Sequence, residues 1–545
     1  MKNITKKQKI LLFIIVIVAL VLRFYKLGQV PAGINRDEAS IGYNAYSILK
    51  TGKEEHGNML PVFIESFGDW KLPAYQYLSI PFIYIFGLSN FSVRFLSALV
   101  GSLSVFVIFL LGKNILSDKK RVSVNVGLFS ALFLAINPWH LHISRIAFEA
   151  NLACFLFLLG LVCFLKGIKK KPKFFLFGSL LWSVALFSYH AAYVFLPLMF
   201  LIIVFKAFKA KFKNKKPLYL GIIVFFTFVF LHLVQFINQA DVKITGVGIT
   251  SDPVIKHLKT ELIRFDHLNP QSLGSRVFHN RFIVYPWLIA EKYLAVFSAD
   301  FLYFNGSDNY HHNITGFGNF YVVNLLFCLI GLFFLLKNKH HNSLLILLWL
   351  ILAPIPSAIT KNSPHSLRAI FLLPVIILVT GVGGAQFLKL IKNKILKKLL
   401  LVIYFIALLL NIGLYLDNYY VHALKTDAKH WNYGMEELYQ YLNSIQDKYK
   451  KVITTHPDYS DYIFYAFYSN YDPKKFLKEV VYYPRDEEGF RHVKQLGNYY
   501  FVENIDEYEL ENLYFDYADA VPANVKILKT INLPNNDPYL VVFEI

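Results

Sequence analysis

Two adjacent acids near the start of the chain, Asp37 and Glu38, are the first candidates for chemistry. They follow an apolar stretch long enough to cross a membrane, and acids close to a membrane surface are costly unless they are solvated or paired. The pair therefore indicates a functional site. Asp37 also precedes an apolar-periodic stretch, so it could instead be the N-cap of a helix. Capping would explain only one of the two acids, and the two roles can coexist.

A second polar segment, Gly68–Pro73, carries Asp69 and Lys71 just before the chain becomes apolar again. The ammonium group of a lysine at this position could hold a lipid phosphate as a point charge. The alternative is a snorkelling lysine, whose apolar stem lies along the membrane while its charged end reaches water.

Two very short polar turns between apolar runs each carry an arginine. The first contains Arg145 and Glu149, and the second contains His365 and Arg368. Arginine is a natural bidentate ligand of phosphate, so both arginines are candidates for binding a phosphate group. For Arg145, an ion pair with Glu149 inside the turn is the alternative.

Tyr189 and His190 form a polar break between two further apolar runs. A lone histidine in such a place is more often a structural residue than a ligand, and both interpretations stay open. His311 and His312 are near the end of a long polar loop, but their spacing is not a metal signature. The chain contains no G-x-x-x-x-G-K-S/T, G-x-S-x-G or H-E-x-x-H motif. ATP-driven transport, serine hydrolysis and zincin chemistry therefore lose support.

The elements that must position these residues are membrane helices. Of the 545 residues, 55% are hydrophobic, and about 20 consecutive apolar residues suffice to cross the hydrocarbon of a bilayer. The apolar runs predict about eleven spans. They lie at about residues 9–27, 91–113, 122–143, 152–168, 174–189, 190–206, 217–238, 320–337, 343–360, 367–388 and 398–416.

The stretch Ala74–Gly87 is apolar, but about 14 residues are too few for a span, which predicts an interfacial or re-entrant helix. Cytoplasmic loops are enriched in lysine and arginine. If this stretch crossed the membrane, the later basic segments would all face outside; if it does not, they all face inside. The second arrangement predicts a multi-pass protein of the cell membrane with a cytoplasmic N-terminus and the candidate residues on the outer face.

The predicted fold is mainly α: a polytopic transmembrane helix bundle over residues 1–416, followed by a small extracytoplasmic α/β domain over residues 417–545. The bundle carries a first outer loop at 28–90 and a long outer loop at 239–319. The predicted elements of the tail are a helix near Met435–Ile445 and strands near Lys451–Thr455 and Tyr539–Ile545.

The formal charge of +20 does not indicate a nucleic-acid-binding protein. The basic residues are spread over short segments between apolar runs, whereas a nucleic-acid surface needs them on one folded face. Their distribution suits the anionic headgroups of membrane lipids instead. All three cysteines fall in apolar runs, so neither a disulfide framework nor a zinc site is expected.

Together, these motifs resemble the membrane-embedded GT-C glycosyltransferases of the protein O-mannosyltransferase and aminoarabinose-transferase type, glycosyltransferase family 39. The resemblance rests on D-E-A at Asp37–Ala39, G-D-x-K-x-P at Gly68–Pro73, the segment Ser92–Ala98 and S-R-x-A-F-E at Ser144–Glu149. It covers about residues 1–390. It implies inverting transfer of a sugar from a polyprenyl- or dolichyl-phosphate carrier to an extracytoplasmic hydroxyl or amine of a protein, lipid or glycan.

The resemblance also implies roles for residues of the first outer loop. Asp37 matches the general base and Glu38 its supporting partner. Lys71 matches the lysine of a lysine–proline segment, although Leu72 intervenes here. Some members of the family bind a divalent metal near this loop, and Asp69 is the candidate ligand for such a metal.

Phosphate as a leaving group needs fixed cations more than a second acid. Arg145 matches an arginine that follows the third span in the family. With Lys71, Arg368 and His365 it makes up the candidate set for binding the donor phosphate. Glu149, Tyr189 and His190 are further site candidates.

Two other functions compete with sugar transfer. A transporter or flippase of lipid-linked sugars would also have many spans, but it should show paired repeats and broken helices near the middle of the membrane. A non-catalytic binding protein would tolerate the loss of Asp37.

Overall fold

The computed structural model describes residues 4–115, 120–169, 171–210, 214–238, 248–249, 252–258, 261, 263–268, 277–337, 342–455, 460–486 and 489–545. The chain divides into two compact units. The first consists of Met1–Arg23, Leu99–Ser144 and Glu149–Tyr415, and the second of Phe24–Ala98, Arg145–Phe148 and Leu416–Ile545. The first outer loop and the tail therefore belong to one unit, although they are far apart along the chain. Asn90 and Glu436, for example, lie 346 positions apart and their side chains are hydrogen-bonded.

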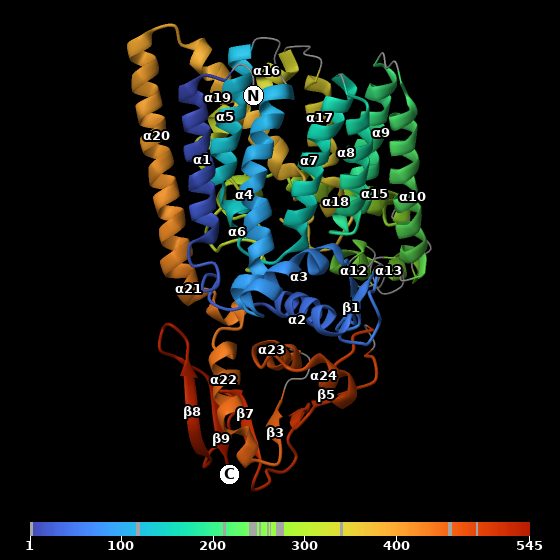
Figure 1. The fold of residues 1–545 in the computed structure, drawn as a ribbon, viewed down its shortest axis with the longest axis vertical. Coiled ribbons are helices and arrows are strands. Elements are labelled where there is room, and N and C mark those ends of the chain that lie inside the picture. Colours follow the sequence, from blue (N-terminus) through green and yellow to red (C-terminus); the bar gives the residue numbers. More distant parts are fainter. Residues whose placement is uncertain are drawn as a thin grey trace. The chain divides into compact units, whose positions relative to one another are not determined.

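The first unit is a bundle of helices (Figure 1). In it, α16 packs along α19, α19 along α5, α7 along α8, and α8 along α10. The helices that lie wholly or mostly in this unit are α1 (Lys6–Phe24), α4 (Asn90–Ile115), α5 (Lys120–Ile136), α6 (Pro138–Ile143), α7 (Glu149–Lys169), α8 (Lys173–Leu186), α9 (Ala191–Phe208), α10 (Lys216–Asn238), α12 (Pro253–His257), α13 (Ile263–Leu268), α15 (Arg281–Ala295), α16 (Leu325–Lys337), α17 (Ser343–Leu352), α18 (Ile355–Ala358), α19 (Leu372–Leu390) and α20 (Lys394–Asp417).

Every predicted span overlaps a helix of the structure. Within the described chain, seven helices are long and apolar enough to cross a membrane. They are Asn90–Asn114, Glu149–Lys169, Ala191–Phe208, Lys216–Val234, Arg281–Phe304, Leu372–Leu390 and Lys394–Thr426, and further apolar helices are shorter. The predicted polytopic helix bundle is thereby confirmed.

One of these candidate spans, Arg281–Phe304, was not predicted, because it falls in the expected outer loop 239–319. Parts of that loop lie outside the described residues. Glu291 and Lys292 interrupt the apolar pattern of the helix, so the sequence does not show it as a continuous apolar run. In the fold Lys292 is buried, and its Nζ lies 2.5 Å from the carboxylate of Asp252.

Small residues allow close approach between α16 and α19. A Cβ atom on Gly383 would lie 1.7 Å from the carbonyl oxygen of Phe327, and one on Gly331 would lie 1.9 Å from that of Val379. Helices in a membrane associate by such backbone packing, since lipid offers no hydrophobic driving force. The glycines of these two helices therefore allow the backbones of α16 and α19 to pack in direct contact.

The second unit begins with the first outer loop. It contains α2 (Arg36–Thr51), the antiparallel pair β1 (Ile64–Ser66) and β2 (Asp69–Lys71), and α3 (Ala74–Phe86). The short apolar helix predicted after Lys71 is confirmed as a helix, and its position at the membrane surface stays a prediction.

The N-cap of α2 is Asn35, so the alternative assignment of this role to Asp37 is wrong. The Asn35 side chain accepts a hydrogen bond from the Glu38 amide at 2.9 Å, and the Asn35 amide donates to the Glu38 carboxylate at 3.4 Å. This reciprocal arrangement is a capping box. It places Asp37 inside the first turn of α2, where its side chain is not needed to cap the start of the helix.

The tail forms a seven-stranded mixed sheet in the order β4-β5-β6-β3-β7-β9-β8. The central strand β3 is parallel to β6 and β7, and the other neighbouring pairs are antiparallel. The strands are β3 (Val452–Thr454), β4 (Val480–Tyr482), β5 (Val493–Leu496), β6 (Tyr499–Phe501), β7 (Leu513–Tyr517), β8 (Lys526–Asn532) and β9 (Pro538–Glu544). The predicted α/β character of the tail is confirmed.

Helices of the tail connect the sheet to the first outer loop. Within the second unit, α2 packs against α23 and α24, and α23 packs against α22 (Figure 1). The contact is tight, because a Cβ atom on Gly42 would lie 2.6 Å from the ring of Phe467. The helical segments of the tail are η5 (Asn418–His422), α21 (Ala423–Thr426), η6 (Ala428–Trp431), α22 (Met435–Ile445), η7 (Gln446–Lys448), α23 (Asp461–Tyr468) and α24 (Pro473–Glu479).

Candidate functional site

Glu38 is the buried anchor of the first turn of α2. Its carboxylate accepts hydrogen bonds from Nε of Arg94 at 2.9 Å and from Nη2 of Arg94 at 3.0 Å. It also accepts one from the amide of Ala147 at 2.8 Å. Both side chains of the pair are fully buried. A bidentate arginine–carboxylate pair with its remaining lone pairs satisfied fixes geometry strongly, so Glu38 ties α2 to the start of α4 and to the Arg145–Phe148 turn.

Asp37 has a different environment from its neighbour. Its side chain is 49% exposed, and Nζ of Lys71 lies 2.6 Å from its Oδ1. The lysine side chain is only 11% exposed and its Nζ lies 5.1 Å from the centre of the Phe67 ring. Successive residues of a helix point about 100° apart, so one acid faces the interior while the other faces outward. Asp37 is thus an accessible carboxylate beside a well-held cation.

Arg145 is fully buried in the same unit. Its Nη2 donates to the carbonyl oxygens of Val30 at 3.0 Å and Lys26 at 3.4 Å, and its Nε donates to the hydroxyl of Tyr419 at 3.3 Å. The guanidinium also lies 5.4 Å from the Tyr419 ring centre and 5.3 Å from that of Tyr420. These contacts hold the loop after α1 against the start of the tail, and the predicted role in phosphate binding stays a prediction.

Asp69 lies in β2, two residues before Lys71, and its Oδ1 accepts a hydrogen bond from the Trp70 amide at 2.7 Å. In the part of the chain that the structure describes, no group of three or more His, Cys, Asp or Glu side chains is arranged to hold a metal. Asp69 as a metal ligand stays a prediction.

The remaining candidates form a separate polar group in the first unit. The rings of His312 and His365 are 4.4 Å apart. Nη1 of Arg368 donates to the hydroxyl of Thr360 at 3.0 Å and to the carbonyl of Lys361 at 2.6 Å. Burial, and then the neighbouring His312 and Arg368, lower the pKa of His365 well below its ordinary value, which keeps its imidazole neutral near pH 7.

Tyr189 and Glu149 belong to this group through electrostatics. The charges of Arg368 and Glu149 both act on the Tyr189 hydroxyl. His190 stands at the edge of the group, with its ring 5.4 Å from that of Tyr193. The predicted part of these residues in donor binding stays a prediction.

Two residues of the second unit were not predicted as site residues. Arg94 was noticed only as part of the segment Ser92–Ala98, and nothing near it in the sequence marks its partner, which is 56 positions away. Tyr419 lies just beyond the last predicted span, in η5 (Asn418–His422), where a tyrosine is ordinary in a membrane protein. An unexpected arginine at the start of an apolar run is the signal that could have revealed Arg94, since charges there are rarely unpaired.

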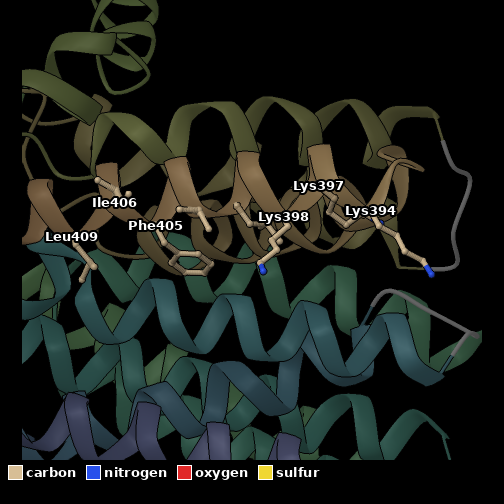
Figure 2. A pocket seen from close by; sticks show the side chains of 8 residues that line it. Lys394, Lys397, Lys398, Phe405, Ile406 and Leu409 are labelled. Carbon is tan, nitrogen blue, oxygen red and sulfur yellow. The ribbon is translucent and has the colours of Figure 1, made fainter.

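A pocket of about 490 Å³ lies along α20, and none of the predicted site residues lines it (Figure 2). Its lysines gather at one end of the helix and its apolar side chains follow toward the other. The lining residues are Lys394, Lys397, Lys398, Leu401, Val402, Phe405, Ile406 and Leu409. A basic end followed by an apolar face is typical of a helix end in contact with lipid, so this pocket is not the catalytic candidate.

Comparison with known proteins agrees with the expected class. Residues 71–234 match a family model described as dolichyl-phosphate-mannose-protein mannosyltransferase. No curated protein matches the chain in sequence. The structure of ArnT from Cupriavidus metallidurans bound to undecaprenyl phosphate is similar, with a TM-score of 0.52 at 11% identity and 97% of both chains covered. The apo form of that protein gives a TM-score of 0.50 at 12% identity.

The chain also aligns with the oligosaccharyltransferase AglB from Archaeoglobus fulgidus, in complex with an inhibitory peptide and a dolichol-phosphate. The TM-score is 0.48 at 13% identity, with 85% of this chain covered. This chain spans 64% of the length of AglB. The match over residues 71–234 and the ArnT-like fold agree with the resemblance to the GT-C membrane glycosyltransferases, and the apolar helices support a multi-pass membrane protein.

Proposed function

We propose that the chain transfers a sugar from a polyprenyl- or dolichyl-phosphate carrier to a hydroxyl or amine outside the cytoplasm, with inversion and with Asp37 as general base. The observation that carries the proposal is the pair formed by Asp37 and Lys71, 2.6 Å apart, in which the carboxylate is half exposed and the ammonium is held in place. A base and a phosphate ligand are the two groups that this reaction needs.

The donor class is supported by the names of similar proteins. The family model that matches residues 71–234 is described by a dolichyl-phosphate sugar donor, and the ArnT structure contains undecaprenyl phosphate. An apolar carrier of this kind suits a protein with helices apolar enough to cross a membrane. The family description names protein as the acceptor, and the proposal keeps protein, lipid and glycan as acceptor classes.

The proposed reaction is a single displacement at the anomeric carbon of the sugar. The acceptor oxygen or nitrogen forms a bond to that carbon while the bond from the carbon to the phosphate oxygen breaks, and the bonding pair leaves with the phosphate. Asp37 takes the proton of the acceptor. The phosphate leaves as an anion without protonation, and the Lys71 ammonium stabilises its growing charge.

Glu38 has a supporting role in this proposal. With both oxygens engaged by Arg94 and the Ala147 amide, it has no free lone pair positioned for a substrate proton. Its rigid attachment instead fixes the turn that carries Asp37. The division between a buried anchor and an accessible base explains why two acids stand side by side.

The orientation follows from the distribution of basic residues. We place the N-terminus in the cytoplasm and the second unit, with Asp37 and the α/β tail, outside the cytoplasm, because lysine-rich segments favour the cytoplasmic face. Cysteine labelling tests this proposal with a membrane-impermeant reagent on intact cells. A cysteine at exposed Asp506 should react and one at exposed Lys7 should not; the reverse pattern would contradict the orientation.

The test of the function uses purified protein, radiolabelled polyprenyl-phosphate sugar and a cell-envelope acceptor fraction. Asp37→Asn should lower transfer by about 10²–10⁴, the usual contribution of a general base, while the melting temperature stays near that of the wild type. Lys71→Met should lower it as well, through the loss of charge stabilisation. Asp506→Asn, an exposed acid of the tail, is the matched control and should retain activity.

Full transfer by Asp37→Asn would refute the assignment of the base. Movement of the labelled lipid across the membrane without transfer would favour a transporter.

A further inference from the structure

The start of α2 is held by a turn of the tail as well as by Glu38. Trp431 and Asn432, which we name the Trp431–Asn432 turn, lie at the end of η6 and belong to the same unit as α2. The amide nitrogen of the Asn432 side chain donates to the carbonyl oxygen of Ile34 at 3.1 Å. Ile34 immediately precedes the N-cap, so this bond acts directly on the segment that leads into the proposed catalytic turn.

Close backbone packing adds to this hydrogen bond. A Cβ atom on Gly33 would lie 2.0 Å from the carbonyl oxygen of Trp431. Real Cβ atoms do not approach that closely, so any residue other than glycine would push the two backbones apart. The turn itself needs an unusual backbone, since Asn432 has φ +49°, in the left-handed region that asparagine tolerates better than most residues.

The ring of Trp431 continues the contact to Arg94. Its centre lies 6.0 Å from Cζ of Arg94, and the tryptophan is 3% exposed. Arg94 in turn donates to the Gly33 carbonyl and to the Pro31 carbonyl at 3.3 Å, besides its pair with Glu38. The guanidinium therefore connects the tail, the loop before α2 and the buried acid of α2.

From these contacts we infer that the α/β tail is a positioning element of the transfer site, and that Trp431 and Asn432 set the location of Asp37 through Gly33, Ile34 and Arg94. The inference rests on the proposed function. Neither residue touches a reacting group, so both are positioning residues. A displacement of about 1 Å at a reacting group can cost about 100-fold in rate, which gives such residues a measurable effect.

The test compares Gly33→Ala, Asn432→Ala, Trp431→Ala and Trp431→Phe in the full-length protein. The first three should lower kcat by about 10- to 100-fold with the KM for donor lipid changed by less than about threefold. Trp431→Phe keeps an aromatic face against Arg94 and should recover most of kcat. Hydrogen exchange of residues 33–40 should become faster in the first three variants.

Phe515→Ala is the matched structural control. Phe515 is buried in β7, and its ring lies 5.9 Å from that of Tyr439, within the core of the tail. Its truncation should lower the melting temperature without a selective loss of kcat at temperatures where the protein is folded. Wild-type kcat in Gly33→Ala and Trp431→Ala would overturn the inference, as would an equal loss in Phe515→Ala.

The two proposals can fail separately. If the wild type transfers no sugar, the proposed function fails, while exchange of residues 33–40 in Trp431→Ala against Phe515→Ala still reports whether the tail holds the start of α2. If transfer occurs and exchange at residues 33–40 is the same in all variants, the positioning role is refuted and the proposed function stands.

Discussion

Asp37 and Glu38 are neighbours in the chain, but their side chains have opposite surroundings. Glu38 is fully buried and engaged by Arg94 and the Ala147 amide, whereas Asp37 is 49% exposed beside Lys71. A buried carboxylate needs a partner because water no longer solvates it. An exposed carboxylate can exchange partners, which a base must do. The difference in exposure therefore supports the proposed division between Glu38 as a structural acid and Asp37 as the general base.

Because Glu38 and Arg94 form a buried pair, we expect the losses of stability caused by substituting each of them to be strongly non-additive. Glu38→Gln or Arg94→Met alone leaves an unpaired buried charge, which typically costs about 3–5 kcal/mol of folding free energy. The double variant should cost less than the sum of the two, because no isolated charge remains. Thermal unfolding in detergent measures the three variants.

The exposed pair of Lys450 and Glu511 provides the control, with side chains 75% and 64% exposed. Neutralising either residue should hardly change the melting temperature, since exposed ion pairs contribute little. Strictly additive effects at Glu38 and Arg94 would show that these two charges do not depend on each other.

Among the helices, polar contacts and small residues decide how the bundle closes. Arg23 of α1 is fully buried and donates to the carbonyl oxygens of Leu134 at 3.1 Å and Ala135 at 3.0 Å, at the end of α5. These carbonyls lack partners inside their own helix. Its Nη2 also lies 2.7 Å from Nδ1 of His140. Arg23 thus caps the C-terminal end of α5, a role that the apolar pattern of α1 does not reveal.

The contact between α16 and α19 predicts that Gly383→Ala destabilises the bundle. The added methyl group would meet the Phe327 carbonyl oxygen at 1.7 Å, and because that atom belongs to a helix backbone the two helices must separate. Overpacking of this kind costs about 1–3 kcal/mol, more than the gain of up to about 1 kcal/mol in helix propensity.

Gly413→Ala is the matched control for this substitution. A Cβ atom there would have no neighbour within 4 Å, so the melting temperature should be unchanged or slightly higher. Equal melting temperatures for the Gly383→Ala variant and the wild type would contradict the close packing of the two helices.

At the scale of the whole molecule, the first outer loop and the tail fold as one unit although they are far apart in sequence. Three polar contacts connect the first outer loop to the tail. Tyr462 donates to Glu55 at 3.2 Å, Arg485 pairs with Glu65 at 2.5 Å, and Asn432 donates to Ile34. The stability of the tail therefore bears on the loop that carries Asp37.

The pH dependence of this unit should reflect Asp461, the first residue of α23. Burial, and then the nearby charge of Asp516, raise the pKa of Asp461 from 3.8 to about 7. A raised pKa means that the folded protein binds the proton more tightly than the unfolded chain does. The resulting stabilisation is fully present below pH 3.8 and is lost as the pH rises to about 7 and above.

Melting temperatures at pH 5 and pH 8 test this dependence. In the wild type the melting temperature should fall between pH 5 and pH 8. Asp461→Asn should show a smaller fall, and its melting temperature at pH 8 should exceed that of the wild type. Asp506→Asn, at an exposed position, should keep the wild-type profile. A decrease of the same size in Asp461→Asn and the wild type would show that other groups control the pH response.

Local composition was sufficient to predict most of the apolar helices, but only one helix and two strands of the tail. Every predicted span overlaps a helix, and the tail helix Met435–Ile445 has the predicted bounds. Apolar runs have this power because crossing a membrane is a property of about 20 consecutive residues. The amphipathic helix Arg281–Ala295 was not predicted, because its charged residues interrupt the apolar run. The ion pair that allows Lys292 to be buried forms only in the folded chain.

The sequence by itself also determined the candidate site residues, among them Asp37, Lys71 and Arg145, because charged residues at a membrane are costly and are usually functional. Only the tertiary structure decided how they differ. It made Asn35 the N-cap, paired Glu38 with Arg94, left Asp37 half exposed and brought Trp431 against Gly33. Each of these outcomes depends on contacts between distant segments, and burial and partnership, which govern the chemistry of a charge, arise only when those segments meet.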